Sequence, residues 1–239
     1  MIGRFTPSSR LIPSVLLAAA ACTTADATPA SEAAAAREAA GAAAATAAQP
    51  AAALRLVVAP TGNEARYLVR ERLMGRDMDN DAVGATSAVT GCIVLDDAGR
   101  IVPAESRFTV NVTGLKTDSD RRDNYVRRRL LQTDSFPTVE LRPTAVRGLP
   151  AGLSLAQPPA GPQTFTLVGD LTVRGVTRPT TWQVTAEYRN GQVTGKAATA
   201  FTFAEFQMTQ PKVPIVLSVA DTIRLEYDFT LVPERPAGM

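Results

Sequence analysis

Residues 165–188 read Phe-Thr-Leu-Val-Gly-Asp-Leu-Thr-Val-Arg-Gly-Val-Thr-Arg-Pro-Thr-Thr-Trp-Gln-Val-Thr-Ala-Glu-Tyr, and this stretch decides the fold. From Phe165 to Val173, apolar side chains and Gly169 occupy every second position, with mostly polar side chains between them. This alternation is typical of a strand with one buried and one solvated face. The pattern breaks at Gly175 and Pro179 and resumes at Trp182, Val184, Ala186 and Tyr188. The stretch therefore predicts two strands that fold back as a hairpin across a connection containing Gly175 and Pro179.

Alternation of the same kind recurs on both sides of this hairpin. Residues 66–73 predict the first strand of the globular part, residues 83–95 a second, residues 108–112 a third and residues 222–231 the last. Asn190-Gly191 predicts a tight turn between strands. About eight antiparallel strands favour an all-β, closed up-and-down barrel, which leaves no exposed edge. A β-sandwich would show the same alternation, so periodicity leaves both folds open.

One short helix is predicted, over residues 118–131. Ser119 or Asp120 would cap its start, and Val126 and Leu130 lie four residues apart and would form a docking edge. The segment carries five arginines: Arg121, Arg122, Arg127, Arg128 and Arg129. They indicate either a site for an anionic headgroup at one mouth of the barrel, or a solvated face on which Arg122 pairs with a nearby carboxylate. The repeated stacking aromatics of a single-strand nucleic-acid site are missing.

Residues 1–21 have the organisation of a secretory signal peptide, with two arginines, a short apolar run and an alanine-rich end. The apolar run is too short to cross a bilayer as a helix. Cys22 follows directly, where a bacterial lipoprotein is cleaved and acylated, although Ala19 stands where leucine is usual. Two outcomes stay open: lipidation of Cys22 with membrane anchoring, or ordinary cleavage nearby. Either outcome implies a periplasmic protein.

The next segment, residues 22–53, is an alanine-rich linker without bulky hydrophobic side chains. Such a segment cannot bury enough surface to offset its ordering entropy, so we expect a disordered tether. Residues 54–233 then form the barrel domain, and residues 234–239 a C-terminal tail. The chain carries a formal charge of +2, and removal of two arginines with residues 1–21 leaves 2 − 2 = 0. Charge therefore gives no support for nucleic-acid binding.

Residue inventory argues against catalysis and against a metal or cofactor. The chain has no histidine, which removes the commonest general base and the usual ligand of zinc and haem. Cys22 and Cys92 form no Cys-x-x-Cys motif, and strand parity points Cys92 away from the barrel interior; a disulfide between the two stays an alternative. Asp77, Asp79 and Asp81 are spaced as in a calcium loop, but its glycine and late glutamate are missing, which favours a polar turn.

Residues 169–179, Gly-Asp-Leu-Thr-Val-Arg-Gly-Val-Thr-Arg-Pro, resemble the signature of the YceI-like family of secreted lipid-binding barrels. Residues 118–141 and, more weakly, residues 201–231 resemble the same family in the expected order, so the resemblance covers roughly residues 54–233. It implies a lipocalin-like barrel. Some members carry histidine where this chain has Asn124 and Arg174, so any role of those histidines is not transferred.

The resemblance also implies the ligand, a long isoprenoid or quinone-type lipid held in an apolar cavity without chemistry. By strand parity, thirteen side chains are candidates for ligand contact: Phe108, Val110, Val112, Phe165, Leu167, Leu171, Trp182, Val184, Phe201, Phe203, Leu225, Tyr227 and Phe229. The same side chains would alternatively fill a solid core. Two hypotheses follow: a periplasmic carrier or store of isoprenoid lipid, and a membrane-tethered structural or interaction module. The oligomeric state is not indicated.

Overall fold

The computed structural model describes residues 52–75, 78–149, 160–212 and 216–234. The predicted signal peptide, Cys22, nearly all of the predicted linker and the tail from residue 235 lie outside these ranges. Within them, ten strands and three short helical segments form: β1 Ala52–Val58, β2 Glu64–Leu73, β3 Asn80–Thr86, β4 Val89–Asp96, β5 Arg107–Asn111, α2 Asp120–Tyr125, η1 Val126–Leu131, β6 Thr138–Arg147, β7 Gln163–Val173, β8 Val176–Arg189, β9 Gln192–Thr202, η2 Ala204–Phe206 and β10 Val216–Pro233.

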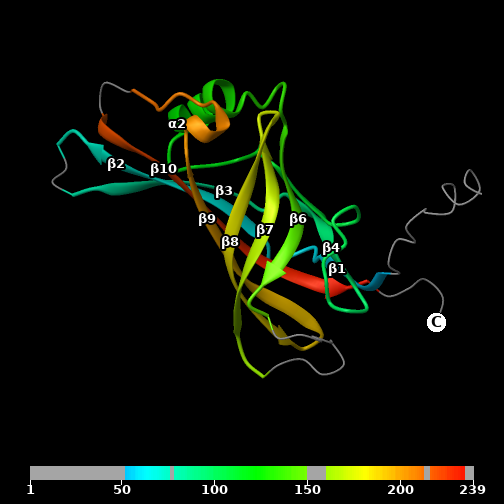
Figure 1. Cartoon of the computed structure of the whole chain (residues 1–239). Helices are drawn as coiled ribbons and strands as arrows, with labels where there is room; N and C mark the ends of the chain where they lie inside the picture. Colours follow the sequence, from blue (N-terminus) through cyan, green and yellow to red (C-terminus); the bar gives the residue numbers. More distant parts are fainter. Residues whose placement is uncertain (1–51, 76–77, 150–159, 213–215, 235–239) are drawn as a thin grey trace, which may run out of the picture. The chain divides into compact units, whose positions relative to one another are not determined.

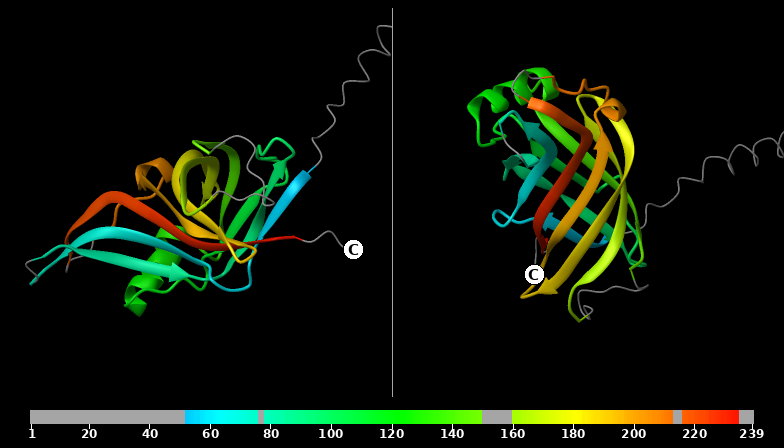
Figure 2. Two further views of the ribbon diagram at one scale, coloured as in Figure 1. Left: turned by 90° about the horizontal axis from the view of Figure 1, so that it is seen from below. Right: turned by 90° about the vertical axis from the view of Figure 1, so that its left-hand side faces the viewer.

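Eight of these strands close into an antiparallel barrel (Figure 1). Strands β4 to β10 are neighbours in chain order, which is an up-and-down meander. Strand β1 closes the ring because Leu56 lies opposite Ile93 of β4 on one side and opposite Pro233 of β10 on the other. The barrel strands incline to one another around a common interior in both views of Figure 2. The predicted closed barrel with one short helical segment is thereby confirmed, and a sandwich is excluded.

The hairpin β2–β3 lies outside that ring. Strand β2 pairs with the first part of β10, from Val216 opposite Leu73 to Asp228 opposite Glu64, whereas β1 pairs only with the end of β10. The 18 residues of β10 therefore serve two partners in succession. We call residues 64–75 and 78–86, which contain β2 and β3, together with residues 216–228 of β10, the tongue.

Two sequence-based strand assignments were wrong. Residues 66–73 are not the first strand, because β1 precedes them, with Leu54 and Leu56 on the barrel interior. Residues 83–95 are not one strand, because the chain breaks at Ser87 and Ala88 between β3 and β4. The break has a topological reason: β3 pairs with β2 in the tongue, whereas β4 pairs with β1 and β5 in the ring.

The predicted hairpin of residues 165–188 is present as β7 and β8, but its connection is shorter than expected. Arg174 (φ 50°) and Gly175 (φ 74°) alone form the turn, and both lie in the left-handed region that two-residue hairpin turns require. Pro179 lies within β8, opposite Asp170. The sheet tolerates this proline because pairing of β8 with β9 begins only at Gln183, so its other side has no ladder to break.

Helical structure covers residues 120–131, close to the predicted range. Ser119 occupies the predicted N-cap position with an extended backbone, but its side chain makes no capping hydrogen bond with the described residues. Thr117 instead donates to Asp123 through its backbone N–H (2.8 Å) and hydroxyl (2.7 Å). The second half, η1, has the wider π-helical hydrogen-bond pattern and ends at Gln132, where φ is 53°. Residues 132–137, with a turn at residues 133–135, then lead into β6.

Outside the barrel interior, Cys92 packs with Val94 and Val102 under the segment that joins β4 to β5. Its thiol lies 3.3 Å from the backbone oxygen of Glu105. This placement agrees with the parity prediction that Cys92 points away from the cavity. A disulfide with Cys22 involves a residue outside the described ranges and stays a prediction.

Candidate functional site

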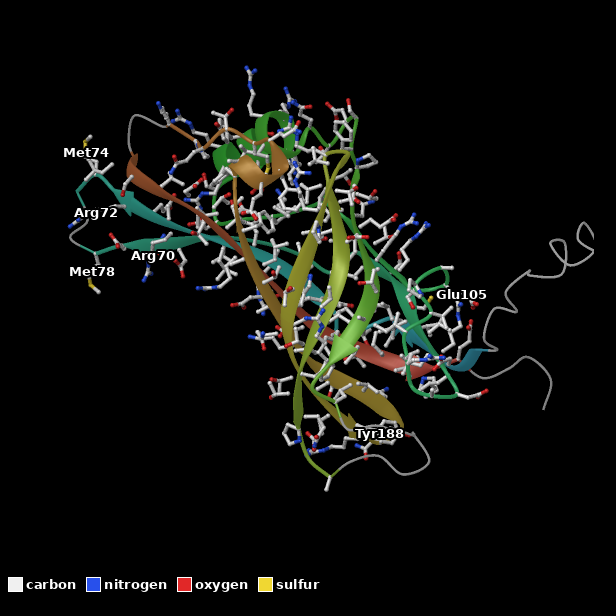
Figure 3. The ribbon with its side chains drawn as sticks, in the orientation of Figure 1. Arg70, Arg72, Met74, Met78, Glu105 and Tyr188 are labelled. Carbon is white, nitrogen blue, oxygen red and sulfur yellow. The ribbon has the colours of Figure 1, made fainter. Side chains whose placement is uncertain are left out.

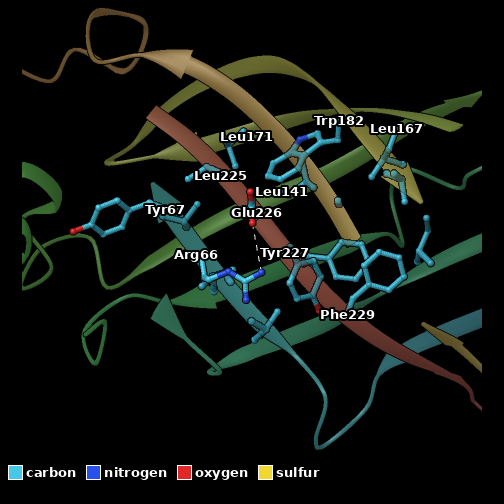
Figure 4. A pocket seen from close by; sticks show the side chains of 18 of the residues that line it. Arg66, Tyr67, Leu141, Leu167, Leu171, Trp182, Leu225, Glu226, Tyr227 and Phe229 are labelled. Carbon is cyan, nitrogen blue, oxygen red and sulfur yellow. Dashed lines mark ion pairs between the residues drawn. The ribbon is translucent and has the colours of Figure 1, made fainter. Parts of the chain in front are cut away.

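The interior of the barrel holds an apolar cavity of about 350 Å³. It lies toward the lower end of the range of about 300–1,000 Å³ that is typical of ligand pockets. A ring of eight strands is wide enough to hold one small ligand when the inward side chains do not fill the interior. This ring therefore has room for a cavity. Figure 4 shows side chains from several strands converging on this space, among them Leu167, Leu171 and Trp182. The wall is made almost entirely of carbon.

The structure places all thirteen candidate side chains on the cavity wall: Phe108, Val110, Val112, Phe165, Leu167, Leu171, Trp182, Val184, Phe201, Phe203, Leu225, Tyr227 and Phe229. They come from five of the closing strands, β5, β7, β8, β9 and β10, with Val112 and Phe203 just beyond strand ends. Strand parity thus identified the inward face of these five strands correctly. Contact with a ligand stays a prediction for each of them.

Other wall residues were not among the thirteen candidates, some because their element was missed and others because a predicted inward face was not followed to the ends of its strand. Leu54 and Leu56 belong to β1, which merges at its start with an alanine-rich sequence. Ile93 and Leu95 lie within the predicted strand of residues 83–95 but were not among the thirteen candidates. In both β1 and β4, the alternation of apolar side chains could have identified these wall residues. The remaining missed apolar wall residues include Tyr67, Val69, Val89, Leu115, Val126, Leu130, Leu131, Val139, Leu141, Val173, Ile223 and Leu231.

The segment α2–η1 lies over one part of the wall, to which it contributes Val126, Leu130 and Leu131. Its position is fixed by Arg122, whose Nη2 lies 2.7 Å from Oε1 of Glu71 on β2. Glu71 is nearly fully buried, with 6% of its surface exposed. A buried carboxylate without its cation would be strongly destabilising, so this ion pair ties the helical segment to the tongue. The carboxylate-pairing alternative is therefore confirmed for Arg122.

A second hydrogen-bond cluster holds the start of the same segment. Asp123 is completely buried, and its Oδ2 lies 3.3 Å from Nζ of Lys116. Burial by itself raises the pKa of Asp123, but the hydrogen bonds from Thr117 and the contact with Lys116 outweigh it and hold the pKa below its ordinary value. Asp123 is therefore an ionised anchor beneath the helical segment.

Two tyrosines bring hydroxyl groups to the wall, and their surroundings differ. Tyr227 donates from Oη to Oδ1 of Asn63 (2.9 Å), and the same Oδ1 accepts the N–H of Thr230 (3.1 Å). The Oη of Tyr67 is buried and finds no hydrogen-bond partner in the described part of the chain. Burial raises the pKa of both phenols, so both remain neutral at physiological pH. The tyrosines thus add ring surface to the cavity without adding charge.

A few polar side chains also line the wall, among them Arg66 and Glu226. Arg66 lies 2.5 Å from both Glu64 and Asp228, and 3.5 Å from Glu226; Figure 4 marks the contact with Glu226. Hydrogen bonds to Glu64 and then Asp228 raise the pKa of Arg66 further above its usual value. Among the described residues, no three His, Cys, Asp or Glu side chains gather where they could hold a metal ion. The site offers van der Waals contact and exclusion of water.

None of the helices in the described ranges has both the length and the apolar character needed to cross a bilayer.

Comparison with known proteins places these features in a family. The family model described as "YceI-like domain" matches residues 58–231. The crystal structure of BcnA from Burkholderia cenocepacia is similar, with a TM-score of 0.51 and 15% identity over 70% of this chain and 95% of that chain. A polyisoprenoid binding domain from Saccharophagus degradans, implicated in plant cell wall breakdown, has a TM-score of 0.54 and 8% identity over 76% of this chain and 99% of that chain. At such identities the likeness shows the shared fold. No curated protein matches the chain.

Proposed function

The chain belongs to the YceI-like family, and from this membership and the apolar cavity we propose that the protein binds a long isoprenoid lipid, for example of the quinone type, without catalysing a reaction on it. The observation that carries the proposal is the carbon-lined cavity enclosed by eight strands. The similar domain from Saccharophagus degradans, described as polyisoprenoid binding, supports the ligand class. The cavity also favours this function over a structural module with a side-chain-filled barrel.

The energetics favour carriage or storage. Burial of each methylene is favourable by about 0.8 kcal/mol, so every ten carbons of the lipid that enter the apolar pocket from water contribute on the order of 8 kcal/mol before ordering costs. A bilayer offers the lipid an equally apolar environment. Net transfer between membrane and barrel therefore lies near balance, and the cavity shields the lipid while it is in water.

The location that we propose is the periplasm, supported by the signal-like residues 1–21. If Cys22 is acylated, residues 22–53 would link the barrel to a membrane. A coil of about thirty residues has a root-mean-square reach of roughly 30 Å, which suffices to hold a small barrel clear of the lipid surface. Mass spectrometry of the intact exported protein distinguishes an acylated Cys22 from cleavage at another position.

Lipid loading tests the proposed function. Protein purified from its own cell envelope is extracted and the extract is analysed by mass spectrometry, with an expected yield near one isoprenoid molecule per chain. Ala197→Leu narrows the cavity, because Ala197 lies on its wall, and should lower the yield. Ala82→Leu is the matched control: Ala82 has the same 6% exposure but is not on the wall. Absence of stoichiometric lipid from the unaltered protein would refute the proposal.

A further inference from the structure

The exposed large apolar side chains of the described residues all lie on the tongue. Met74 is 63% exposed, Met78 80%, Leu217 59% and Val83 37%. Figure 3 shows Met74 and Met78 at the far end of the tongue, away from the ring. Isolated exposed apolar residues are ordinary, but their concentration on one projection marks an interaction site.

None of these side chains lines the cavity, so the end of the tongue is a separate surface. Arg70 and Arg72 follow Met74 back along β2, as Figure 3 shows. Each has an acidic neighbour, Asp81 at 3.3 Å and Asp79 at 4.0 Å, yet more than half of each arginine side chain stays exposed. Exposed apolar side chains followed by arginines suit an interface between hydrocarbon and water. There the aliphatic part of an arginine side chain lies along apolar groups while its guanidinium stays solvated.

The arginine-bearing segment α2–η1 contacts the tongue. The ion pair between Arg122 and Glu71 joins them, and Glu71 of β2 lies three residues before Met74, which directly follows β2. Residues 116–131 contain six basic and three acidic side chains, and 6 − 3 gives a charge of +3. Within the described ranges, three exposed arginines of this segment have no ion-pair partner: Arg121, Arg128 and Arg129. A basic surface therefore adjoins an apolar tip.

We propose that the end of the tongue and segment α2–η1 together dock on the surface of an anionic lipid bilayer. In this arrangement Met74, Met78 and Leu217 enter the boundary between headgroups and acyl chains, while the unpaired arginines face the headgroups. A bilayer fits better than a protein partner, because stable protein interfaces use about 20–30 residues a side, whereas membrane docking needs a few apolar insertions and a positive field. The proposal does not depend on lipid loading. Docking would also bring the bilayer next to the cavity, because α2–η1 contributes to the cavity wall.

Vesicle sedimentation tests the docking. The full chain is used with Cys22→Ser throughout, so that acylation cannot anchor it, and vesicles of phosphatidylcholine alone are compared with equal parts of phosphatidylcholine and phosphatidylglycerol. We expect binding to the anionic vesicles only, weakening as salt is raised. The variant M74S/M78S/L217S should bind more weakly by about tenfold per side chain. The variant R121Q/R128Q/R129Q should lose about fivefold per arginine.

A charge-matched control is R142Q/R147Q/R189Q, which removes three exposed arginines from other surfaces and should bind like the unaltered protein. The midpoint of urea unfolding checks that each variant is folded, whether or not it carries lipid. Failure of the unaltered protein to bind anionic vesicles overturns the proposal. Equal binding by M74S/M78S/L217S overturns it too, as does a result in which that variant changes only self-association of the protein.

Discussion

Ala197→Leu tests whether the barrel interior is truly hollow, because the sign of its effect on stability differs between a hollow and a solid core. Ala197 lies on β9 opposite Tyr227 of β10 and Val184 of β8, all three on the cavity wall. Leucine adds three carbon atoms. At about 0.8 kcal/mol for each, their burial is favourable by roughly 2.4 kcal/mol. Ordering the longer side chain costs about 0.5–1 kcal/mol.

The balance predicts that A197L stabilises the lipid-free protein by about 1–2 kcal/mol. In a close-packed core the same enlargement would destabilise by about 1–3 kcal/mol. Ala82→Leu supplies that comparison, since Ala82 is equally buried on β3 but away from the cavity. We expect a loss of about 1–3 kcal/mol for A82L.

The assay is equilibrium unfolding of delipidated protein in urea, with the change in midpoint read at an unchanged slope. Thermal midpoints should move by about 2–4 °C per kcal/mol for a domain of this size, upward for A197L and downward for A82L. If A197L destabilises as much as A82L, the interior is packed solid and the lipid-binding argument fails with it.

Three further outcomes concern stability. Gly91→Ala should cost about 3 kcal/mol in urea unfolding, because φ is 131° and a Cβ would lie 2.0 Å from a backbone oxygen of β5; an unchanged midpoint would contradict this geometry. Asn63→Ala leaves the buried hydroxyl of Tyr227 unpaired and should cost about 1–3 kcal/mol, a loss that the added change Tyr227→Phe should partly restore. The lowered pKa of Asp123 gives stability that is complete above its ordinary pKa of 3.8 and is lost as pH falls through the lower folded-state value. Asp123→Asn should therefore flatten the dependence of unfolding free energy on pH below 3.8, and an unaltered profile would exclude this role.

Strand parity proved the most reliable part of the sequence-based prediction. Alternation from Phe165 to Val173 and from Ile223 to Leu231 identified inward faces that the structure places on the cavity wall. It succeeded because a pleated strand sends successive side chains to opposite faces whatever its partners are. Its failure at β1 is equally physical: with an alanine-rich start, the short alternation of Leu54 and Leu56 could not be distinguished from the preceding linker.

Strand parity could not predict contacts between residues that are far apart in the sequence. The five arginines of residues 121–129 look alike in the sequence, yet only Arg122 meets the buried carboxylate of Glu71, 51 positions away. The tongue was missed for a related reason. Strand β10 changes its neighbour from β2 to β1 along its length, and no local pattern encodes where such an exchange occurs.

The sequence by itself determined the antiparallel strands, the inward face of most of them, the single short helical segment and, through the residues 169–179, the family resemblance. Local backbone geometry dictates each of these, so a few neighbouring residues suffice. Only the tertiary structure decided that the ring closes with eight strands around an open interior, that α2–η1 lies against the tongue, and that the exposed methionines gather at its end. These features depend on how far apart whole strands lie once they are paired, and that spacing is a property of the assembled sheet.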